Sequence, residues 1–255
     1  MRKEFRDVML AAVPKWYSPW GHLAGSVGVG VVYLFLGIWG LRRLAPLELL
    51  TVPIVFVILN LAEWFIHKNI MHRRRRVLAV LYDRHTPEHH RVFRADSMAI
   101  RSALELRLVL IPAAGVLGIV TLSVPAALLA GWLLVPNVGW LLLMTTAVYV
   151  VGYELSHLLY HFPEHSAPYR SRVLHTLREH HARHHDPRCM QKYNFNVTIP
   201  LGDLLFGTMA PHPPPLVNAH SEHGARRSVH RDIRERKSSD NWSSRTRRNA
   251  RSFPP

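Results

Sequence analysis

The chain has 255 residues, of which 48% are hydrophobic, and its formal net charge is +15 at pH 7 with histidine counted as neutral. Soluble enzymes seldom combine so large an apolar fraction with so large a charge, so apolar and charged residues must occupy separate stretches. The single cysteine, Cys189, excludes a disulfide framework and a thiolate zinc site.

Four long apolar runs come first along the chain. They cover residues 23–41, 49–66, 108–135 and 138–153, and Glu63 is the only charged residue within them. These lengths approach or exceed the ~17–25 residues that span a bilayer as a helix. The runs also lack the amphipathic alternation of helices in soluble proteins. The sequence therefore predicts an all-α integral membrane protein with about four transmembrane helices.

The third run is too long for one straight span and contains Pro112 and Pro125. These prolines could kink a single helix or mark a re-entrant hairpin. Two crossings would place His157, which follows the fourth run, on the opposite face from His67 and His90. We therefore expect a single long crossing that is kinked or tilted.

Lysine and arginine accumulate in residues 1–22, in residues 68–107 and after residue 170, whereas the loop between the last two runs is uncharged. The positive-inside rule places these basic regions, and with them both termini and the His-rich segments, on the cytoplasmic side. The pair Arg42 and Arg43, between the first two runs, is the exception.

The two ends of the chain are expected to lie outside the membrane domain, which we assign to residues 23–208. Residues 1–22 form a basic interfacial segment. Residues 209–255 are rich in Pro, Ser and Arg and contain too few apolar residues to bury a core, which predicts disorder. Because no fold that organises nucleic-acid contacts is visible, we expect the tail to be solvated or to meet anionic lipid, and we expect no nucleic-acid partner.

Histidines form four clusters between the apolar runs and after them, reading "HKNIMH", "HTPEHH", "HLLYH" and "HHARHH". All four lie on the basic side of the predicted membrane, and histidine is the commonest metal ligand in proteins. The clusters contain eleven histidines, and even ten imidazoles are too many for one ion, so two ions are predicted. Imidazole suits iron, zinc, copper and nickel alike. Neutral imidazole ligands do not balance the positive charge of two metal ions. Oxide, hydroxide or peroxide bound between the ions would balance it, which suits a centre that reacts with oxygen.

Helical spacing indicates which rings can act together. Residues four apart lie about 40° apart on a helix of ~3.6 residues per turn, so His157 and His161 can grip one ion, as can His85 and His89.

The spacings of the last and first clusters differ from this pattern. His181, His184 and His185 span about 100° on the same ~3.6-residue period and could reach two neighbouring ions. His67 and His72 are five residues apart, a poorer match to that period. These two are expected to serve from a helix end or to bind different ions.

The ordered series of a H-x4-H box after an apolar run, a box ending in His-His, a later H-x3-H box and a final H-x2-H-H box resembles the fatty acid hydroxylase or sterol desaturase superfamily. Members are integral-membrane non-haem di-iron oxygenases. The stretch "NFNVTIPLGDLLFGT", residues 194–208, is similar to the segment that follows the last box in that family. The likeness covers about residues 49–208.

The resemblance implies a four-helix membrane anchor and a cytosolic helical cap that holds two irons, with zinc able to replace iron during purification. It implies O2 as co-substrate, a lipid whose C–H bond is hydroxylated or desaturated, and an external electron donor such as a ferredoxin, cytochrome b5 or a reductase. No catalytic side chain beyond the metal ligands is implied. Carried over box by box, the metal ligands would be His67, His72, His85, His89, His90, His157, His161, His181, His184 and His185.

Two details depart from the family pattern or exceed it. The second box reads H-x3-H-H where H-x2-H-H is usual, which makes His85 the weakest carry-over. His175 and His180 are additional, and we expect them to support a ligand or to lie on the surface. Each ligand should also have a hydrogen-bond acceptor behind it. Four carboxylates near the boxes are candidates for this role: Glu63, Asp83, Glu154 and Asp186.

Two other functions remain open from sequence. A metal transporter would place histidines or acids inside the apolar runs, where only Glu63 qualifies. A non-catalytic zinc-binding membrane protein would use the same ligands as an enzyme. Pocket residues are not marked by any motif, so the sequence does not identify the lipid.

Overall fold

Every regular element of the described chain is a helix. The computed structural model describes residues 2–164 and 166–211, and no strand occurs among them. Nearly all of the predicted disordered tail, residues 212–255, lies outside the described residues. The principal α-helices are α1 (Arg2–Ala11), α2 (Pro19–Gly40), α3 (Thr51–Ile66), α4 (Ala79–Arg84), α5 (His90–Val92), α6 (Leu106–Val109), α7 (Ala113–Leu122), α8 (Val124–Leu133), α9 (Pro136–Tyr160), α10 (Arg172–His184) and α11 (Leu201–Leu205).

Within the described residues, four helical stretches are long and apolar enough to cross a membrane. They are Pro19–Gly40, Pro46–Met71, Ala103–Leu133 and Pro136–Tyr160. The second and fourth extend beyond the apolar runs of the sequence and carry His67 and His157 at their ends. The count of four confirms the prediction of an all-α integral membrane protein.

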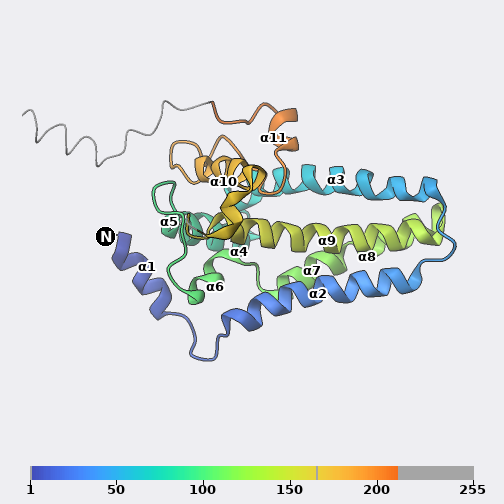
Figure 1. Cartoon of the computed structure of the whole chain (residues 1–255), viewed down its shortest axis with the longest axis horizontal. Helices are drawn as coiled ribbons and strands as arrows, with labels where there is room; N and C mark the ends of the chain where they lie inside the picture. Colours follow the sequence, from blue (N-terminus) through green and yellow to red (C-terminus); the bar gives the residue numbers. More distant parts are fainter. Residues whose placement is uncertain (1, 165, 212–255) are drawn as a thin grey trace, which may run out of the picture. The chain divides into compact units, whose positions relative to one another are not determined.

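The four crossings alternate in direction. In Figure 1, α2 and the pair α7 and α8 lead away from the end that carries α4, α5 and α10, whereas α3 and α9 lead back to it. At the far end, the side chain of Asn137 ties the two turns together: its Oδ1 accepts from the Arg42 N–H at 2.9 Å and its Nδ2 donates to the Arg42 carbonyl at 2.7 Å. Arg42 therefore lies at the end of the bundle opposite the histidines.

The long third run forms one crossing with a break. Helix α7 ends at Leu122 and α8 begins at Val124, with Pro125 in its first turn. At the junction the Ser123 hydroxyl donates to the Val120 carbonyl at 2.7 Å. Proline cannot donate to the preceding turn, so the helix is interrupted there without reversing. The expected kinked single crossing is confirmed.

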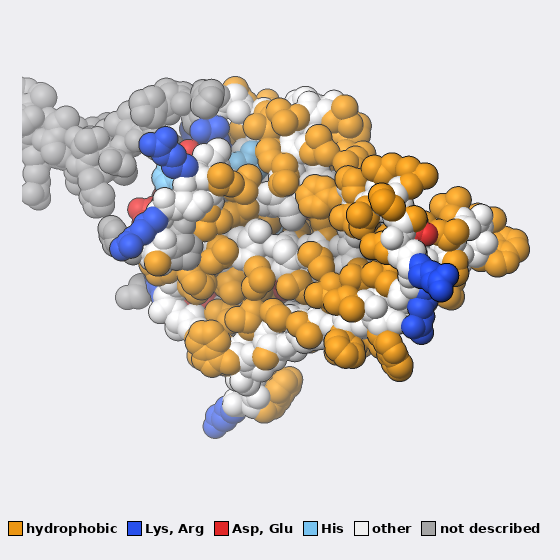
Figure 2. All heavy atoms as spheres, turned by 45° about the vertical axis from the view of Figure 1, so that its right-hand side comes forward, with side chains coloured by type: hydrophobic (Ala, Val, Ile, Leu, Met, Phe, Trp, Pro, Cys, Tyr) orange, Lys and Arg blue, Asp and Glu red, His pale blue; other side chains and the backbone are white. Residues whose placement is uncertain are grey.

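Helix α9 lies at the centre of the bundle and is the most deeply buried of the four crossings. Its neighbours approach closely where glycine leaves space, as at Gly139, beside the Ala127 carbonyl of α8. The outer faces are apolar, with Phe35, Ile58 and Leu129 exposed on α2, α3 and α8. Figure 2 shows one side of the molecule, on which hydrophobic side chains cover most of the surface and Lys and Arg gather towards the ends. This pattern suits a surface surrounded by lipid.

The end of the bundle that carries the histidines is built from short elements. Helices α4, α5, α6, α10 and α11 gather there, and α1 packs against α5. Phe93, Leu106 and Leu158 belong to a small apolar core in this cap. A buried ion pair joins Arg6 of α1 to Glu105, with the Arg6 Nε 2.7 Å from Oε1.

Adding a methyl group at Gly139 should destabilise the bundle. A Cβ at this position would lie 2.5 Å from the backbone oxygen of Ala127, which must then move. We expect Gly139→Ala to lower the free energy of unfolding in detergent by about 1–3 kcal/mol, the usual range for overpacking. Gly118→Ala is the matched control, because a Cβ there meets nothing within 4 Å. Equal thermal unfolding midpoints for the two variants would contradict this packing.

Candidate metal centre

The ten predicted ligand histidines all lie in the cap, in two groups of five. The first cluster consists of His67, His72, His85, His90 and His184. The second cluster consists of His89, His157, His161, His181 and His185. Within each cluster one ring nitrogen from every residue lies within 4.8 Å of the others, and every one of the ten residues is buried. Each cluster could therefore hold a metal ion.

Helix ends bring the rings together. His157 lies in the last turn of α9, and His161 directly follows that helix. His181 and His184 lie at the end of α10, which His185 caps. The other histidines lie in two short π-helical turns or directly after them. These turns are η2 (His67–Met71), after α3, and η3 (His85–His89), after α4.

The π-helical turns explain the five-residue spacing that an α-helix does not. The His72 N–H donates to the His67 carbonyl at 3.1 Å, and the His90 N–H donates to the His85 carbonyl. An i to i+5 hydrogen bond stacks residue i+5 over residue i, so both pairs face one cluster. His67 is the C-cap residue of α3, so the expectation that this pair serves from a helix end agrees with the structure. The alternative, that the two rings face different ions, is wrong, because both belong to one cluster.

A second pairing also differs from the sequence-based expectation. His85 and His89 were expected to share one ion, but they point into different clusters because η3 is a π turn rather than an α-helical one. His157 and His161 do share the second cluster, as expected.

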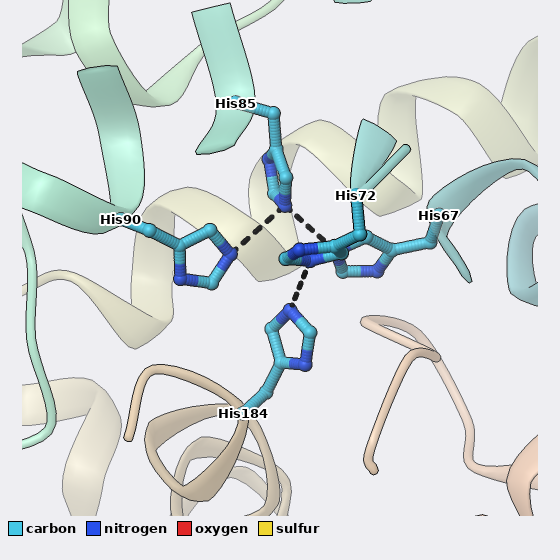
Figure 3. A group of neighbouring side chains, drawn as sticks. All are labelled: His67, His72, His85, His90 and His184. Carbon is cyan, nitrogen blue, oxygen red and sulfur yellow. Dashed lines mark hydrogen bonds between the residues drawn. The ribbon is translucent and has the colours of Figure 1, made fainter. Parts of the chain in front are cut away.

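Helix α10 supplies both clusters, as its spacing predicts. His181 and His185 lie four residues apart and belong to the second cluster, while His184 reaches the first. The His185 and His181 Nε2 atoms are 3.0 Å apart. Figure 3 shows His184 approaching the first cluster from α10, opposite His85.

Backbone carbonyls lie behind half of the rings. Because a carbonyl oxygen only accepts, Nδ1 of each such ring must carry the hydrogen, and Nε2 then presents a lone pair. The pairs are His67 with Phe195, His89 with Leu108, His161 with Met98, His184 with Tyr193 and His185 with Phe93, the last four at 2.7–2.9 Å.

The Nε2 lone pairs face one another at short range. His89 and His185 are both held as Nδ1–H tautomers, yet their Nε2 atoms are 3.2 Å apart. In the first cluster the His72 and His184 Nε2 atoms are 2.9 Å apart. The His161 Nε2 is buried and has no hydrogen-bond partner among the described residues. The lone pairs of His89 and His185 repel at this separation, so the arrangement fits a cation between the rings.

Burial keeps the rings in the form that binds metal. It lowers the pKa of His72 to about 2 and that of His89 to about 4. Burial, together with the charge of neighbouring rings when they are protonated, also lowers the pKa of other members outside the spanning helices: His85, His90, His161, His181, His184 and His185. Neutral imidazoles at neutral pH are metal ligands, whereas imidazolium ions are not.

Residues 52–208 match a model of the fatty acid hydroxylase family, which is more than half of the chain. The chain belongs to this family. The match begins in α3 and ends at Thr208, so it contains both clusters and the segment after the last box. Membership in the fatty acid hydroxylase family suggests an oxygenase-type membrane enzyme that acts on lipids. Neither a search of curated proteins nor a search of solved structures found a match.

The four acids expected to support the ligands hold other groups, so that expectation is wrong. Glu63 accepts from the Val197 and Thr198 amides, and Glu154 accepts from the Ile111 amide at 2.9 Å. Asp83 pairs with Arg74, and Asp186 pairs with Arg188. Peptide carbonyls take the acceptor role instead, and they have no side-chain signature in a sequence.

Sequence reasoning missed Asp203, which is fully buried beside the first cluster. Its carboxylate accepts from the His180 Nε2 at 3.2 Å and from the Thr208 hydroxyl at 2.6 Å. Burial alone would raise the pKa of Asp203, but these bonds and two backbone amides hold it below its usual value. His180 therefore supports a carboxylate rather than a metal, while His175 is exposed beside Glu179.

Removing the imidazole of His180 should destabilise the cap. His180→Ala leaves the buried Asp203 carboxylate without one donor, which typically costs about 1–3 kcal/mol. His175→Ala, on the exposed face of the same helix, should stay within about 0.5 kcal/mol of the wild type. Thermal unfolding of the two variants in detergent measures the difference. Equal losses would show that the contact between His180 and Asp203 contributes nothing.

Proposed function

We propose that the two clusters bind two iron ions and that the chain is an O2-dependent hydroxylase or desaturase of a lipid C–H bond. The observation that carries this proposal is the convergence of five buried imidazoles in each cluster, with the neutral Nε2 lone pairs of His89 and His185 opposed at 3.2 Å. Membership in the fatty acid hydroxylase family supports the reaction class.

The donor sets favour a reactive centre over a structural one. Structural zinc is almost always held by four ligands in a tetrahedron, whereas each cluster offers five imidazoles. We assign all ten histidines as ligands, each through Nε2 where Nδ1 is held by a carbonyl. Iron in such a centre would supply O2 activation, and the side chains would supply its position and its dry surroundings.

The proposed hydroxylation joins one oxygen atom of O2 to carbon and converts the other to water. It consumes two electrons and two protons from outside the lipid. We infer that a separate protein or reductase, such as a ferredoxin or cytochrome b5, delivers the electrons. Desaturation would instead remove two hydrogens from the chain and reduce both oxygen atoms to water.

Aromatic side chains help to exclude water from each cluster. The fully buried ring of Phe195 lies 5.6 Å from that of His184, and the ring of Phe93 lies 4.5 Å from that of His161, centroid to centroid. Because α3 and α9 carry histidines at their ends, the clusters lie where the apolar bundle ends. We infer that the lipid enters from the bilayer, which its apolar chain has no reason to leave.

We also infer that the clusters face the cytoplasm. The exposed run Arg73–Arg76 follows the first cluster's His72, and further arginines surround α10. This concentration of cations at one end of the bundle is what the positive-inside rule associates with the cytoplasmic side.

The purified chain should contain two metal ions. We expect elemental analysis of protein expressed in iron-rich medium to approach two irons per chain, with some zinc, which stands higher in the affinity order. His184→Ala should lose the ion of the first cluster. His175→Ala is the control, because this exposed ring belongs to neither cluster. Tight binding of zinc alone, with no iron-dependent turnover, would favour a non-catalytic protein.

Expression with a general electron donor should alter the lipids of the host. We expect mass spectrometry to detect a lipid that has gained one oxygen atom or lost two hydrogens in cells with the wild-type chain. Cells with His184→Ala should lack it, because disturbing even the groups behind a metal ligand typically reduces activity by about 10- to 100-fold, and this variant removes a proposed ligand itself. Identical lipid profiles for the two strains would contradict the enzymatic proposal.

A further inference from the structure

The carbonyls behind the two clusters come from two separate segments. Tyr193 and Phe195 hold His184 and His67, both of the first cluster. We call residues 193–198 the C-terminal scaffold. It contains a left-handed residue, Asn194 with φ of 58°, between the two carbonyls. Asparagine tolerates this conformation better than most residues do.

The second cluster is held by a different stretch, residues 93–109, which we call the loop scaffold. Three of its carbonyls accept from rings of the second cluster. The pairs are Phe93 with His185, Met98 with His161 and Leu108 with His89. Neither scaffold provides a carbonyl to the other cluster among these five bonds.

Two carboxylates, those of the buried Asp203 and the half-buried Glu63, fix the C-terminal scaffold. Asp203 accepts from the backbone N–H groups of Phe195 at 2.9 Å and Asn196 at 2.8 Å. Glu63 accepts from the next two, those of Val197 and Thr198. Four successive amides are thus bound, and the carbonyl of Phe195 cannot rotate away from His67 without breaking these bonds.

One buried ion pair fixes the loop scaffold. Glu105 accepts from the Arg101 N–H at 2.8 Å, and its partner Arg6 donates to the Ala99 carbonyl at 2.9 Å. These two contacts flank Ile100, whose N–H donates to the His161 carbonyl at 2.8 Å. The Met98 carbonyl, which accepts from the His161 ring, lies in the same irregular stretch, directly before Ala99.

We propose that Asp203 with Glu63, and Glu105 with Arg6, are positioning residues that act on different metal ions. The first pair orients ligands of the first cluster through the C-terminal scaffold. The second pair orients ligands of the second cluster through the loop scaffold. The inference rests on the proposed function, because it presupposes that the clusters bind metal.

Cobalt binding tests this division. The full-length chain in detergent is loaded with Co²⁺, whose visible absorption depends on its ligands, and cobalt is counted by elemental analysis. His184→Ala and His161→Ala provide reference spectra for loss of the first and of the second site. Asp203→Asn and Glu105→Gln are the matched test variants, because both replace a fully buried carboxylate with its amide.

We expect Asp203→Asn to lower the cobalt affinity of the first cluster by about 10- to 100-fold, the usual effect of disturbing the groups behind a ligand. The remaining absorption spectrum should then match that of His184→Ala. Glu105→Gln should lower the cobalt affinity of the second cluster, and its spectrum should match that of His161→Ala. Asp83→Asn, at an exposed ion pair with Arg74, should retain both ions. Equal weakening of both sites in either test variant, or of neither, overturns the division.

Two outcomes separate this inference from the proposed function. A wild-type chain that takes up fewer than two cobalt ions overturns both. Two ions in the wild type with equal losses in the variants overturn the division alone. If the amide variants fail to fold, Thr198→Val and Arg6→Lys replace them, since each weakens one scaffold while keeping its carboxylates. A chelator should then remove cobalt faster from one site only, and faster loss from both sites overturns the proposal.

Discussion

Burial of uncharged imidazoles with their lone pairs facing one another is the constraint on which the cap depends. Such an arrangement is unfavourable unless a cation lies between the rings, because desolvated lone pairs repel and buried polar atoms need partners. The pair of His89 and His185, whose Nδ1 atoms are both held by carbonyls and whose Nε2 atoms are 3.2 Å apart, shows how closely such lone pairs approach. The helix ends, the π turns and the carbonyls behind the rings all serve to hold this arrangement.

Much of the architecture follows from residue pattern alone. Apolar length predicts the four crossings, and the parity of crossings predicts that the run around Ser123 crosses once. The i, i+4 spacing predicts that His157 and His161 act together, since α9 continues as a regular helix to Tyr160. The division of α10 between two clusters follows from the same geometry. These predictions succeed because the α-helix has a constant period of ~3.6 residues per turn, so spacing in the sequence determines which side chains share a face.

Other features depend on contacts that no local pattern encodes. The five-residue pair of His67 and His72 faces one cluster because η2 is a π turn. Such turns are rare, so the α-helical period is the one that a sequence pattern is compared with. The partners of the rings are peptide carbonyls, which every residue has. Asp203 lies 136 residues after His67 in the chain, so its effect on that ligand is visible only when the chain is folded.

Glu63 and Asp203, the acids near the clusters, accept hydrogen bonds from backbone amides and from side chains other than the ligand rings. A count of their lone pairs shows that they have no acceptor site left for a metal ion. A carboxylate offers about four acceptor sites. Glu63 accepts from Tyr149, Val197 and Thr198, and Asp203 accepts from four groups, so neither has acceptor sites left for a metal. The two clusters consist of imidazoles alone, so the donor set is neutral. Bound cations would keep their charge until anionic oxygen ligands from outside the protein balance it, which suits a centre proposed to react with O2.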